Sequence, residues 1–529
     1  MSARLNVALG LVLLLVASAA AAGQQAKKTV KKQLSTAPEP DAPEVQLSLG
    51  WLGGRWVQTR AGRRVAAFTA VPYAQPPVGD LRFKAPVPVE PWASPRESPP
   101  LQQVPVCMQS EDAAFTQGLL RSEDCLLLNV FTPSAVNGSN LPVLVWLHGG
   151  AFQEGGAAPY GPEFLLDRDV VLVTVNYRLG ALGFLSTGDT ASTGNWGLKD
   201  QQLALRWVQQ HIAALGGDPE QVTLIGQSAG AISVHSHVSS WSSRGLFQRA
   251  VSMGGSALTL GLPQSAALAR RYAAKLAVKL GCPEAPSADL VSCLRAKPAR
   301  DLVAHEAALK EGGLCPIITW GPVVEDFVEV ADKGRQSNPP FLERHPVDAV
   351  TNGLVVDVPW LTGLNLNEGG LWTAMIQASK QVEAFDAQLD SLAPLCFGFN
   401  DTVDPDELPG LMQEIREFYL GTNNITSENL RDLSKLFTDG TMLWGLDEAV
   451  RLHAAYSSSP AYLYLLSHRG KRSLTELFGG GDGHGVVHGD ELLYLFPLSN
   501  ILASREEDPD DRKVSELLID VLINFAKNG

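Results

Sequence analysis

The chain has 529 residues, of which 45% are apolar and 19% are charged, and this composition excludes a largely disordered or fibrous protein. Its 42 Lys and Arg against 56 Asp and Glu give a net charge of −14 at pH 7, so it lacks a basic surface for phosphate backbones and we expect no nucleic acid partner. The length alone leaves the number of domains open, because large α/β enzymes can form one unit of this size.

The first 43 residues carry export and linker signals. Arg4 precedes an apolar run at 7–17, and small residues at 20–22 offer a cleavage site, which predicts a signal peptide at 1–22 and a secreted, extracellular protein. The alternative is a membrane anchor. A bilayer requires about 18 to 20 apolar residues, and the run reaches this length only by including Ser18 and the alanines, so we expect no stable membrane anchor. Residues 23–43, rich in Lys and Pro, predict a flexible linker.

The segment that follows predicts a sheet. Two short alternating runs separated by glycines, at 45–49 and 64–68, indicate a small antiparallel meander. Longer apolar runs come next and are typical of strands buried on both faces. They lie at 126–131, 142–147, 170–175 and 222–225.

Helical patterns alternate with these strands and then dominate. Residues 199–214 have helical periodicity between two predicted strands, and after about residue 258 most segments look helical until a strand returns at 461–466. We therefore predict an α/β fold whose central sheet is mostly parallel, with helices on both faces and long insertions. We treat 44–529 as one domain.

Gly226-Gln-Ser-Ala-Gly230 directly follows a predicted strand and precedes an apolar helical stretch. The five-residue pattern alone is a weak signal, but in this context it predicts a sharp strand-to-helix turn that exposes the Ser228 hydroxyl at a helix N-terminus. Flanking glycines suit such a turn because they lack the Cβ atoms that would clash with nearby backbone. The alternative is a tight turn whose serine only forms hydrogen bonds.

A serine nucleophile needs a base, and the order serine, acid, histidine directs attention to the glycine-rich loop near the C-terminus. His484 and His488 both lie there, and His488 precedes what looks like a helix start that would fix its position. A metal site of these two histidines with Asp482 and Asp490 is the alternative, but no supporting ligand motif is present and we expect no metal.

The remaining parts of a hydrolytic site have weaker signals. Glu368 lies on a loop after a short apolar strand, where an acid could orient the histidine, although a solvated loop acid fits equally well. His148-Gly-Gly-Ala-Phe152 follows another strand, and its small residues would let backbone N–H groups approach a developing oxyanion. An ordinary glycine turn is the alternative at that position.

Six cysteines follow the leader, an even number that permits disulfides in an exported chain. Loops closed by near neighbours favour Cys107 with Cys125 and Cys282 with Cys293. Cys315 and Cys396 are left unassigned, with free thiols as one outcome. Three Asn-X-Ser/Thr triplets in polar, turn-rich surroundings predict N-glycosylation, at Asn137, Asn400 and Asn424.

Six motifs carry a family resemblance: Ser122-Glu-Asp-Cys-Leu-Leu-Leu-Asn129, His148-Gly-Gly-Ala-Phe152, Gly194-Asn-Trp-Gly-Leu-Lys-Asp-Gln201, the Ser228 turn, Asn367-Glu-Gly369 and His488-Gly-Asp-Glu491. Their combination resembles the type-B carboxylesterase family from about residue 44 to the end, and Gln227 before the serine resembles arthropod members.

The resemblance implies an α/β-hydrolase fold and an enzyme that cleaves small-molecule carboxylic esters without a cofactor. It assigns Ser228, Glu368 and His488 to the catalytic roles and the oxyanion donors to the backbone of Gly150, Ala151 and Ala229. It also implies the disulfides Cys107–Cys125 and Cys282–Cys293.

Three departures from the family pattern stand out. Gly254 occupies a position where a hydroxyl near the triad is common, and the 107–125 loop contains Phe115 but no tryptophan, which makes choline esters unlikely as preferred substrates. Family members usually run on through a further helix after the point where this chain ends. A catalytically silent adhesion or receptor-type ectodomain on the same fold is the alternative function, because a fold alone does not fix an activity.

Overall fold

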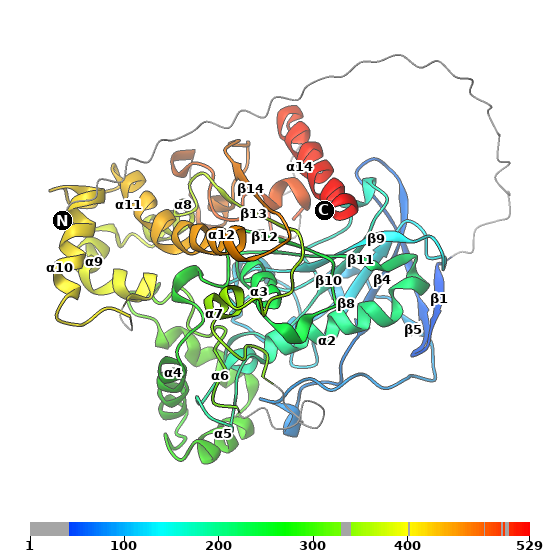
Figure 1. Cartoon of the computed structure of the whole chain (residues 1–529), viewed down its shortest axis with the longest axis horizontal. Helices are drawn as coiled ribbons and strands as arrows, with labels where there is room; N and C mark the ends of the chain where they lie inside the picture. Colours follow the sequence, from blue (N-terminus) through cyan, green and yellow to red (C-terminus); the bar gives the residue numbers. More distant parts are fainter. Residues whose placement is uncertain (1–41, 329–339, 400–401, 481, 499–500, 503–506) are drawn as a thin grey trace. The chain divides into compact units, whose positions relative to one another are not determined.

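The computed structural model of the protein describes residues 42–328, 340–399, 402–480, 482–498, 501–502 and 507–529 (Figure 1). The predicted signal peptide at 1–22, most of the predicted linker at 23–43 and the predicted glycosylation site Asn400 lie outside these residues. The chain from Ala42 to Gly529 groups into one unit.

A mixed sheet of nine strands crosses the described part of the chain in the order β14-β13-β12-β11-β9-β10-β8-β4-β3. The six strands from β14 to β10 in this order are parallel to one another, whereas β8, β4 and β3 are antiparallel to their neighbours. The strands are β3 (Arg55–Gln58), β4 (Arg64–Pro72), β8 (Leu127–Thr132), β9 (Leu141–Leu147), β10 (Val171–Val175), β11 (Gly217–Gln227), β12 (Arg249–Met253), β13 (Trp360–Asn365) and β14 (Ala461–Leu466). Only a short segment joins β8 to β9, and this reverses the chain direction because a parallel crossover needs a dozen or more residues.

The sheet separates two hydrophobic cores, because successive side chains of a strand point to opposite faces. Val143, Val145 and Leu147 of β9 belong to one core, and Leu144 and Trp146 belong to the other. Both sets are buried, and each such side chain contributes about 1.5–3 kcal/mol relative to exposure. This explains why the strands read as continuous apolar runs in the sequence.

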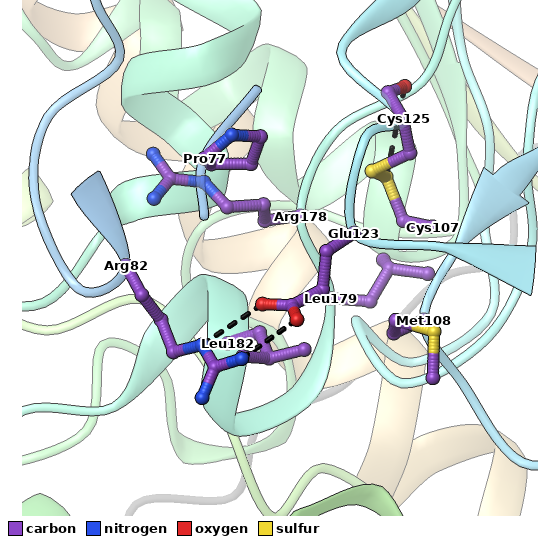
Figure 2. A pocket seen from close by; sticks show the side chains of 9 residues that line it. All are labelled: Pro77, Arg82, Cys107, Met108, Glu123, Cys125, Arg178, Leu179 and Leu182. Atoms are coloured by element: carbon purple, nitrogen blue, oxygen red, sulfur yellow. Dashed lines mark hydrogen bonds and ion pairs between the residues drawn. A yellow bond between two sulfur atoms is a disulfide. The ribbon is translucent and has the colours of Figure 1, made fainter. Parts of the chain in front are cut away.

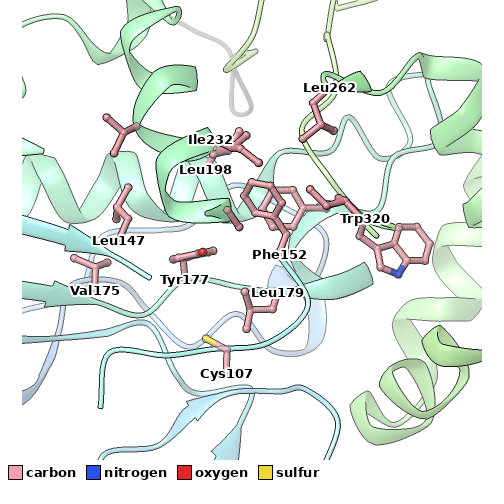
Figure 3. Packing of buried hydrophobic residues seen from close by; sticks show 14 of the residues in the cluster. Cys107, Leu147, Phe152, Val175, Tyr177, Leu179, Leu198, Ile232, Leu262 and Trp320 are labelled. Atoms are coloured by element: carbon pink, nitrogen blue, oxygen red, sulfur yellow. The ribbon is translucent and has the colours of Figure 1, made fainter. Parts of the chain in front are cut away.

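Helices cover both faces of the sheet, as Figure 1 shows. Figure 3 shows Leu147 and Val175 of the sheet on the side of Leu198 from α2 and Ile232 from α3. The opposite core contains Leu522 and neighbouring residues of α14. The helices are α1 (Gly180–Phe184), α2 (Trp196–His211), α3 (Ala229–Val238), α4 (Ala266–Lys279), α5 (Ser287–Ala296), α6 (Ala299–Glu306), α7 (Pro346–Thr351), α8 (Gly370–Ala378), α9 (Val382–Phe397), α10 (Leu408–Leu420), α11 (Leu430–Phe437), α12 (Trp444–Tyr456), α13 (Leu492–Leu495) and α14 (Pro509–Asn528).

Two long insertions separate the last strands of the sheet. Helices α4 to α7 lie between β12 and β13, and α8 to α12 lie between β13 and β14, which matches the predicted helical region after residue 258. Among the helices that the structure describes, none is both long enough and apolar enough to cross a membrane.

The predicted N-terminal meander is divided between two sheets. Strand β2 (Gly50–Gly53) pairs with β1 (Glu44–Leu47) on one side and with β5 (Arg96–Glu97) on the other, whereas β3 and β4 join the main sheet. The chain changes sheets at Gly54, where an added Cβ would lie 2.8 Å from the Phe68 ring. A larger residue would therefore push the two sheets apart at this point.

Three disulfides join the six cysteines in pairs. Cys107 pairs with Cys125 and Cys282 pairs with Cys293, the two pairs that short loops favoured. Figure 2 shows the first of them beside Glu123, which accepts two hydrogen bonds from Arg82 at 2.8 and 2.6 Å. Cys315 and Cys396, which the sequence left unassigned, form a third disulfide across 81 residues. Pairing cysteines by their closeness in the sequence could not predict this disulfide, because only the fold brings Cys396 of α9 next to Cys315.

Candidate active site

Ser228 lies between the end of β11 and the start of α3, in a backbone conformation with φ 57° and ψ −122°. Few residues other than glycine adopt a positive φ, so the surrounding structure must hold the turn. An added Cβ on Gly226 would lie 2.3 Å from the Gly230 carbonyl oxygen, and one on Gly230 would lie 2.0 Å from the Leu147 carbonyl oxygen. The two glycines therefore let α3 start directly against β9, with Ser228 at the top of the turn.

The 148–152 loop lies against this turn. An added Cβ on Gly149 would lie 3.0 Å from the Ser228 Cβ, so only glycine allows this approach. Gly150, Ala151 and Phe152 follow with positive φ values of 111°, 53° and 59°. Three consecutive residues in this region are costly for the backbone, and such strain is typical of functional loops.

Three backbone N–H groups near Ser228 lack an acceptor. Those of Gly150, Ala151 and Ala229 donate to no group among the described residues. Ala229 is the first residue of α3, where an N–H has no partner within the helix. The Ser228 N–H, by contrast, donates to the Met253 carbonyl at 2.9 Å. The free donors are the ones that the family resemblance assigns to the oxyanion.

His148 supports this loop. Its ring stacks on Tyr177 with centroids 4.4 Å apart, and the Tyr177 hydroxyl donates to the His148 carbonyl at 2.7 Å. Burial lowers the pKa of His148 to about 4, so the ring is neutral at physiological pH. Its Nδ1 lies 2.8 Å from the Gly149 carbonyl oxygen, which fixes the first turn of the loop.

Glu368 and His488 form a buried pair. His488 Nδ1 lies 2.5 Å from Glu368 Oε2, and the other carboxylate oxygen accepts the Asn365 N–H at 2.6 Å. Glu368 is fully buried, which excludes the solvated loop acid that the sequence left as an alternative. With Nδ1–H donating to the carboxylate, His488 Nε2 is left as the acceptor nitrogen. The Gln227 amide nitrogen lies 3.3 Å from this Nε2, so the acceptor faces the Ser228 turn.

A turn rather than a helix start fixes His488. Asp490 accepts the Val487 N–H at 2.9 Å and the Leu474 N–H at 2.8 Å, while Asn365 donates to the Val487 carbonyl at 2.7 Å. The expected helix, α13, begins only at Leu492. Sequence reasoning missed these supports, because Asn365 lies 122 positions before its acceptor. Trp372 of α8 also stacks on the His488 ring, with centroids 5.3 Å apart.

Negative groups around His488 favour its protonated form. Burial lowers the pKa of His488, but Glu368, Glu491 and Asp490 outweigh it, so the pKa is raised above the ordinary 6.5. Burial, followed by repulsion from Glu368, raises the pKa of Glu491. Burial also raises the pKa of Asp490 to about 6. The site is therefore built to stabilise an imidazolium next to Ser228.

Ser228 and His488 line one cavity of about 290 Å³ together with Gly150 and Ala151. Most of its other walls are apolar and come from seven separate parts of the chain. These side chains are Phe115, Ile232, Leu260, Leu314, Ile317, Ile318, Leu371, Trp372, Met375, Met442, Leu474 and Phe478. The cavity can hold an apolar molecule with its reacting carbon near Ser228 and the free N–H groups.

The other predicted residues lie apart from this chemistry. His484 bonds Gln377 Oε1 at 3.0 Å and Thr373 at 3.2 Å. In the described ranges, no group of three or more His, Cys, Asp or Glu side chains is arranged to hold a metal ion. Asn137 and Asn424 are exposed, as glycan acceptors need to be.

Gly254 lies beside the pair, as the family resemblance implied. An added Cβ there would lie 3.2 Å from His488 Cε1, and the residue has a φ of 64°. The absence of a side chain hydroxyl therefore goes together with a backbone conformation that favours glycine.

Comparisons with known proteins agree with this geometry. Residues 41–529 match the model of the carboxylesterase family. A carboxylic ester hydrolase from Bombus ignitus is 38% identical over 503 residues, covering 92% of this chain and 86% of the relative. The venom carboxylesterase-6 of Apis mellifera and the juvenile hormone esterase of Tribolium castaneum are each 34% identical, covering 93% of this chain and 86% and 84% of the relatives.

A solved structure extends the comparison to the fold. The juvenile hormone esterase of Manduca sexta, with OTFP covalently attached, superposes with a TM-score of 0.81 at 28% identity. The match covers 92% of this chain and 90% of that one. The predicted α/β-hydrolase fold is thereby confirmed.

Proposed function

The chain belongs to the carboxylesterase family and is a carboxylic ester hydrolase, and we propose that it cleaves esters through an acyl intermediate on Ser228. The observation that carries this proposal is the convergence of three features on one cavity. These are the Ser228 turn, the buried Glu368–His488 pair and the N–H groups of Gly150 and Ala151, which have no acceptor.

In the first half of the reaction, Ser228 Oγ attacks the ester carbonyl carbon and its proton passes to His488 Nε2. The carbonyl oxygen becomes negative and accepts hydrogen bonds from the N–H groups of Gly150, Ala151 and Ala229, which have no other acceptor among the described residues. Glu368 holds the Nδ1–H and stabilises the imidazolium. His488 then protonates the leaving alcohol as the C–O bond breaks.

In the second half, water replaces the alcohol. His488 takes a proton from the water, whose oxygen attacks the acyl carbon and forms a second tetrahedral intermediate on the same three donors. Collapse breaks the bond to Ser228 Oγ, which regains its proton from the imidazolium. The products are an acid and an alcohol, and the residues return to their starting state.

The substrates we propose are small esters with apolar chains. The apolar walls of the cavity favour such chains through burial of their surface, about 25 cal/mol per Å². The 107–125 loop contributes Phe115 and no tryptophan to the cavity, and Phe attracts a quaternary ammonium group less than Trp does, so we expect choline esters to be poor substrates.

Secretion is part of the proposal. The three disulfides and the exposure of Asn137 and Asn424 support it, in agreement with the predicted signal peptide at 1–22. Expression of the full chain in insect cells tests it. We expect a glycosylated protein in the medium whose N-terminus begins near residue 23, and an unprocessed protein retained in cells would contradict this.

The decisive experiment measures hydrolysis of p-nitrophenyl butanoate and labelling by an organophosphate. Ser228→Ala should remove turnover and labelling together, and His488→Asn should remove turnover. His484→Asn is the matched control because it changes the other histidine of the same loop, and it should stay close to wild type. A silent ectodomain would show neither reaction in the wild-type chain, and labelling at another serine would reject the assignment.

A further inference from the structure

The cavity beside Ser228 is lined by three charged side chains that the proposed reaction does not use. Apart from Gln227, Ser228 and His488, its polar side chains are Asp112, Glu154 and Lys310. Asp112 is exposed, whereas Glu154 and Lys310 are half-buried. Charged groups in an otherwise apolar cavity cost free energy unless they bind something, so their presence calls for an explanation.

Glu154 is held by the oxyanion loop. Its N–H donates to the Gly150 carbonyl at 3.0 Å, and an added Cβ on Gly150 would lie 3.0 Å from Glu154 Cγ. Burial raises the pKa of Glu154, while Lys310 and a backbone hydrogen bond from Ala114 oppose the shift. The backbone of Glu154 is therefore tied to the loop whose N–H groups would bind the ester carbonyl.

Lys310 comes from another segment of the cavity wall, and it also lines an outer hollow beside that wall. Its Nζ donates to the Ile317 carbonyl at 3.5 Å, a long hydrogen bond, and in the described ranges it makes no ion pair within 4.0 Å. The same carbonyl accepts the Gln153 amide at 3.1 Å, which joins this wall to the oxyanion loop. Burial lowers the pKa of Lys310, and attraction from Glu154 and Glu306 opposes the shift. Two of the three ammonium donors are therefore available to a ligand.

The charge balance selects the kind of ligand group. An anion would be attracted by Lys310 but repelled by Glu154. A cation would be attracted by Glu154 but repelled by Lys310. A hydroxyl suits both residues, since it donates to the carboxylate and accepts from the ammonium. Hydrogen bonds to charged groups are also stronger than those between neutral groups.

We propose that Glu154 and Lys310 together bind a hydroxyl group carried by the substrate at a distance from its ester bond. The preferred substrate class is then an ester with apolar chains and one remote hydroxyl, such as a hydroxyacyl ester or the monoester of a diol. This inference rests on the proposed function of the same cavity, because it concerns the substrate of the Ser228 reaction.

Two matched substrate series test it. The first compares p-nitrophenyl hexanoate with p-nitrophenyl 6-hydroxyhexanoate and with the p-nitrophenyl monoester of adipic acid. The second compares hexyl butanoate with 6-hydroxyhexyl butanoate, so that the hydroxyl is presented on either side of the ester. We expect the hydroxyl ester to exceed its alkyl partner in kcat/KM by about tenfold in at least one series, and the adipate to be the poorest acyl substrate.

Two variants identify the residues responsible. In Lys310→Met and in Glu154→Gln, the hydroxyl-to-alkyl ratio should fall close to one, and organophosphate labelling reports whether each variant is folded. Lys279→Met is the matched control, since Lys279 is an exposed lysine on the hollow outside the same wall. It should keep the wild-type ratio.

The outcomes separate this inference from the proposed function. A ratio near one in both series for the wild type, or a preference kept in either folded variant, would overturn the role of the pair while Ser228-dependent hydrolysis remained. Hydrolysis that persists in Ser228→Ala would instead overturn the proposed function.

Discussion

The Ser228 turn and the 148–152 loop are built differently from the walls of the cavity that they line. Ser228 and the 148–152 loop follow directly from the ends of β11 and β9, and backbone contacts at glycines set their positions. The walls come largely from the insertions, where side chains such as Leu314, Met375 and Met442 meet from distant parts of the chain. The two turns tolerate almost no change in backbone shape. The side chains that line the cavity walls can change while the turns keep their positions.

From this difference between the turns and the walls, we expect the largest effect for Glu368→Gln. We expect kcat to fall by about 10⁴-fold, because an amide in place of the carboxylate no longer selects the Nδ1–H tautomer or stabilises the imidazolium. Glu368 also raises the pKa of His488, and the base must be neutral, so the acidic limb of the kcat/KM profile should move to lower pH in the variant. A pH series of hydrolysis rates checks both, and an acidic limb at the wild-type pH would contradict the assigned role.

Gly230→Ala should have the next largest effect. The new Cβ would lie 2.0 Å from the Leu147 carbonyl oxygen, which must push α3 away from β9. Because one oxyanion donor contributes about 10²- to 10³-fold, we expect a loss of at least this size in kcat, with a lower Tm. Wild-type kinetics would show that the turn can relax at little cost.

Removing the third disulfide should affect the walls more than the chemistry. For Cys315→Ser combined with Cys396→Ser we expect a loss of about 2–4 kcal/mol in the free energy of unfolding. Organophosphate labelling of the folded fraction should stay near wild type, while discrimination between acyl chain lengths weakens. Chemical denaturation and a chain-length series measure the two effects, and a parallel loss of labelling would mean that the two regions are not independent.

The smallest effect, of opposite sign, is expected for Gly410→Ala in the insertion helix α10. Its added Cβ would meet nothing within 4 Å, and alanine has a higher helix propensity than glycine. We expect a gain of about 0.5–1 kcal/mol in stability and unchanged kinetics. A destabilised protein would show that α10 depends on a contact absent from this structure.

The sequence predicted the turns better than the walls for a physical reason. The Gly226, Ser228 and Gly230 pattern reports a local backbone geometry, so one short segment contains the information. The Glu368 assignment was ambiguous because its burial and its contact with His488 depend on residues 120 positions apart. Asn365 had no local signal, because it donates to a backbone carbonyl 122 positions away, and Asp490 likewise accepts from Leu474 in another segment besides its local contact with Val487.

The same limit explains the cysteines and the cavity. Short loops favoured Cys107–Cys125 and Cys282–Cys293, but Cys315 meets Cys396 only after both insertions have folded. Glu154 and Lys310 also come from separate segments, and neither belongs to a recognisable motif. The residues that line a cavity are brought together by the tertiary structure, so short sequence motifs do not identify them.

The three proposed oxyanion donors belong to two segments, with Gly150 and Ala151 after β9 and Ala229 after β11. They converge only when these neighbouring strands are paired, so an unfolded or misregistered chain has the serine but not the environment that makes it react. On the proposed mechanism, covalent labelling of Ser228 would therefore count native molecules. It could follow refolding, storage or secretion of this protein in a crude mixture, with no need for purification or for knowledge of its natural substrate.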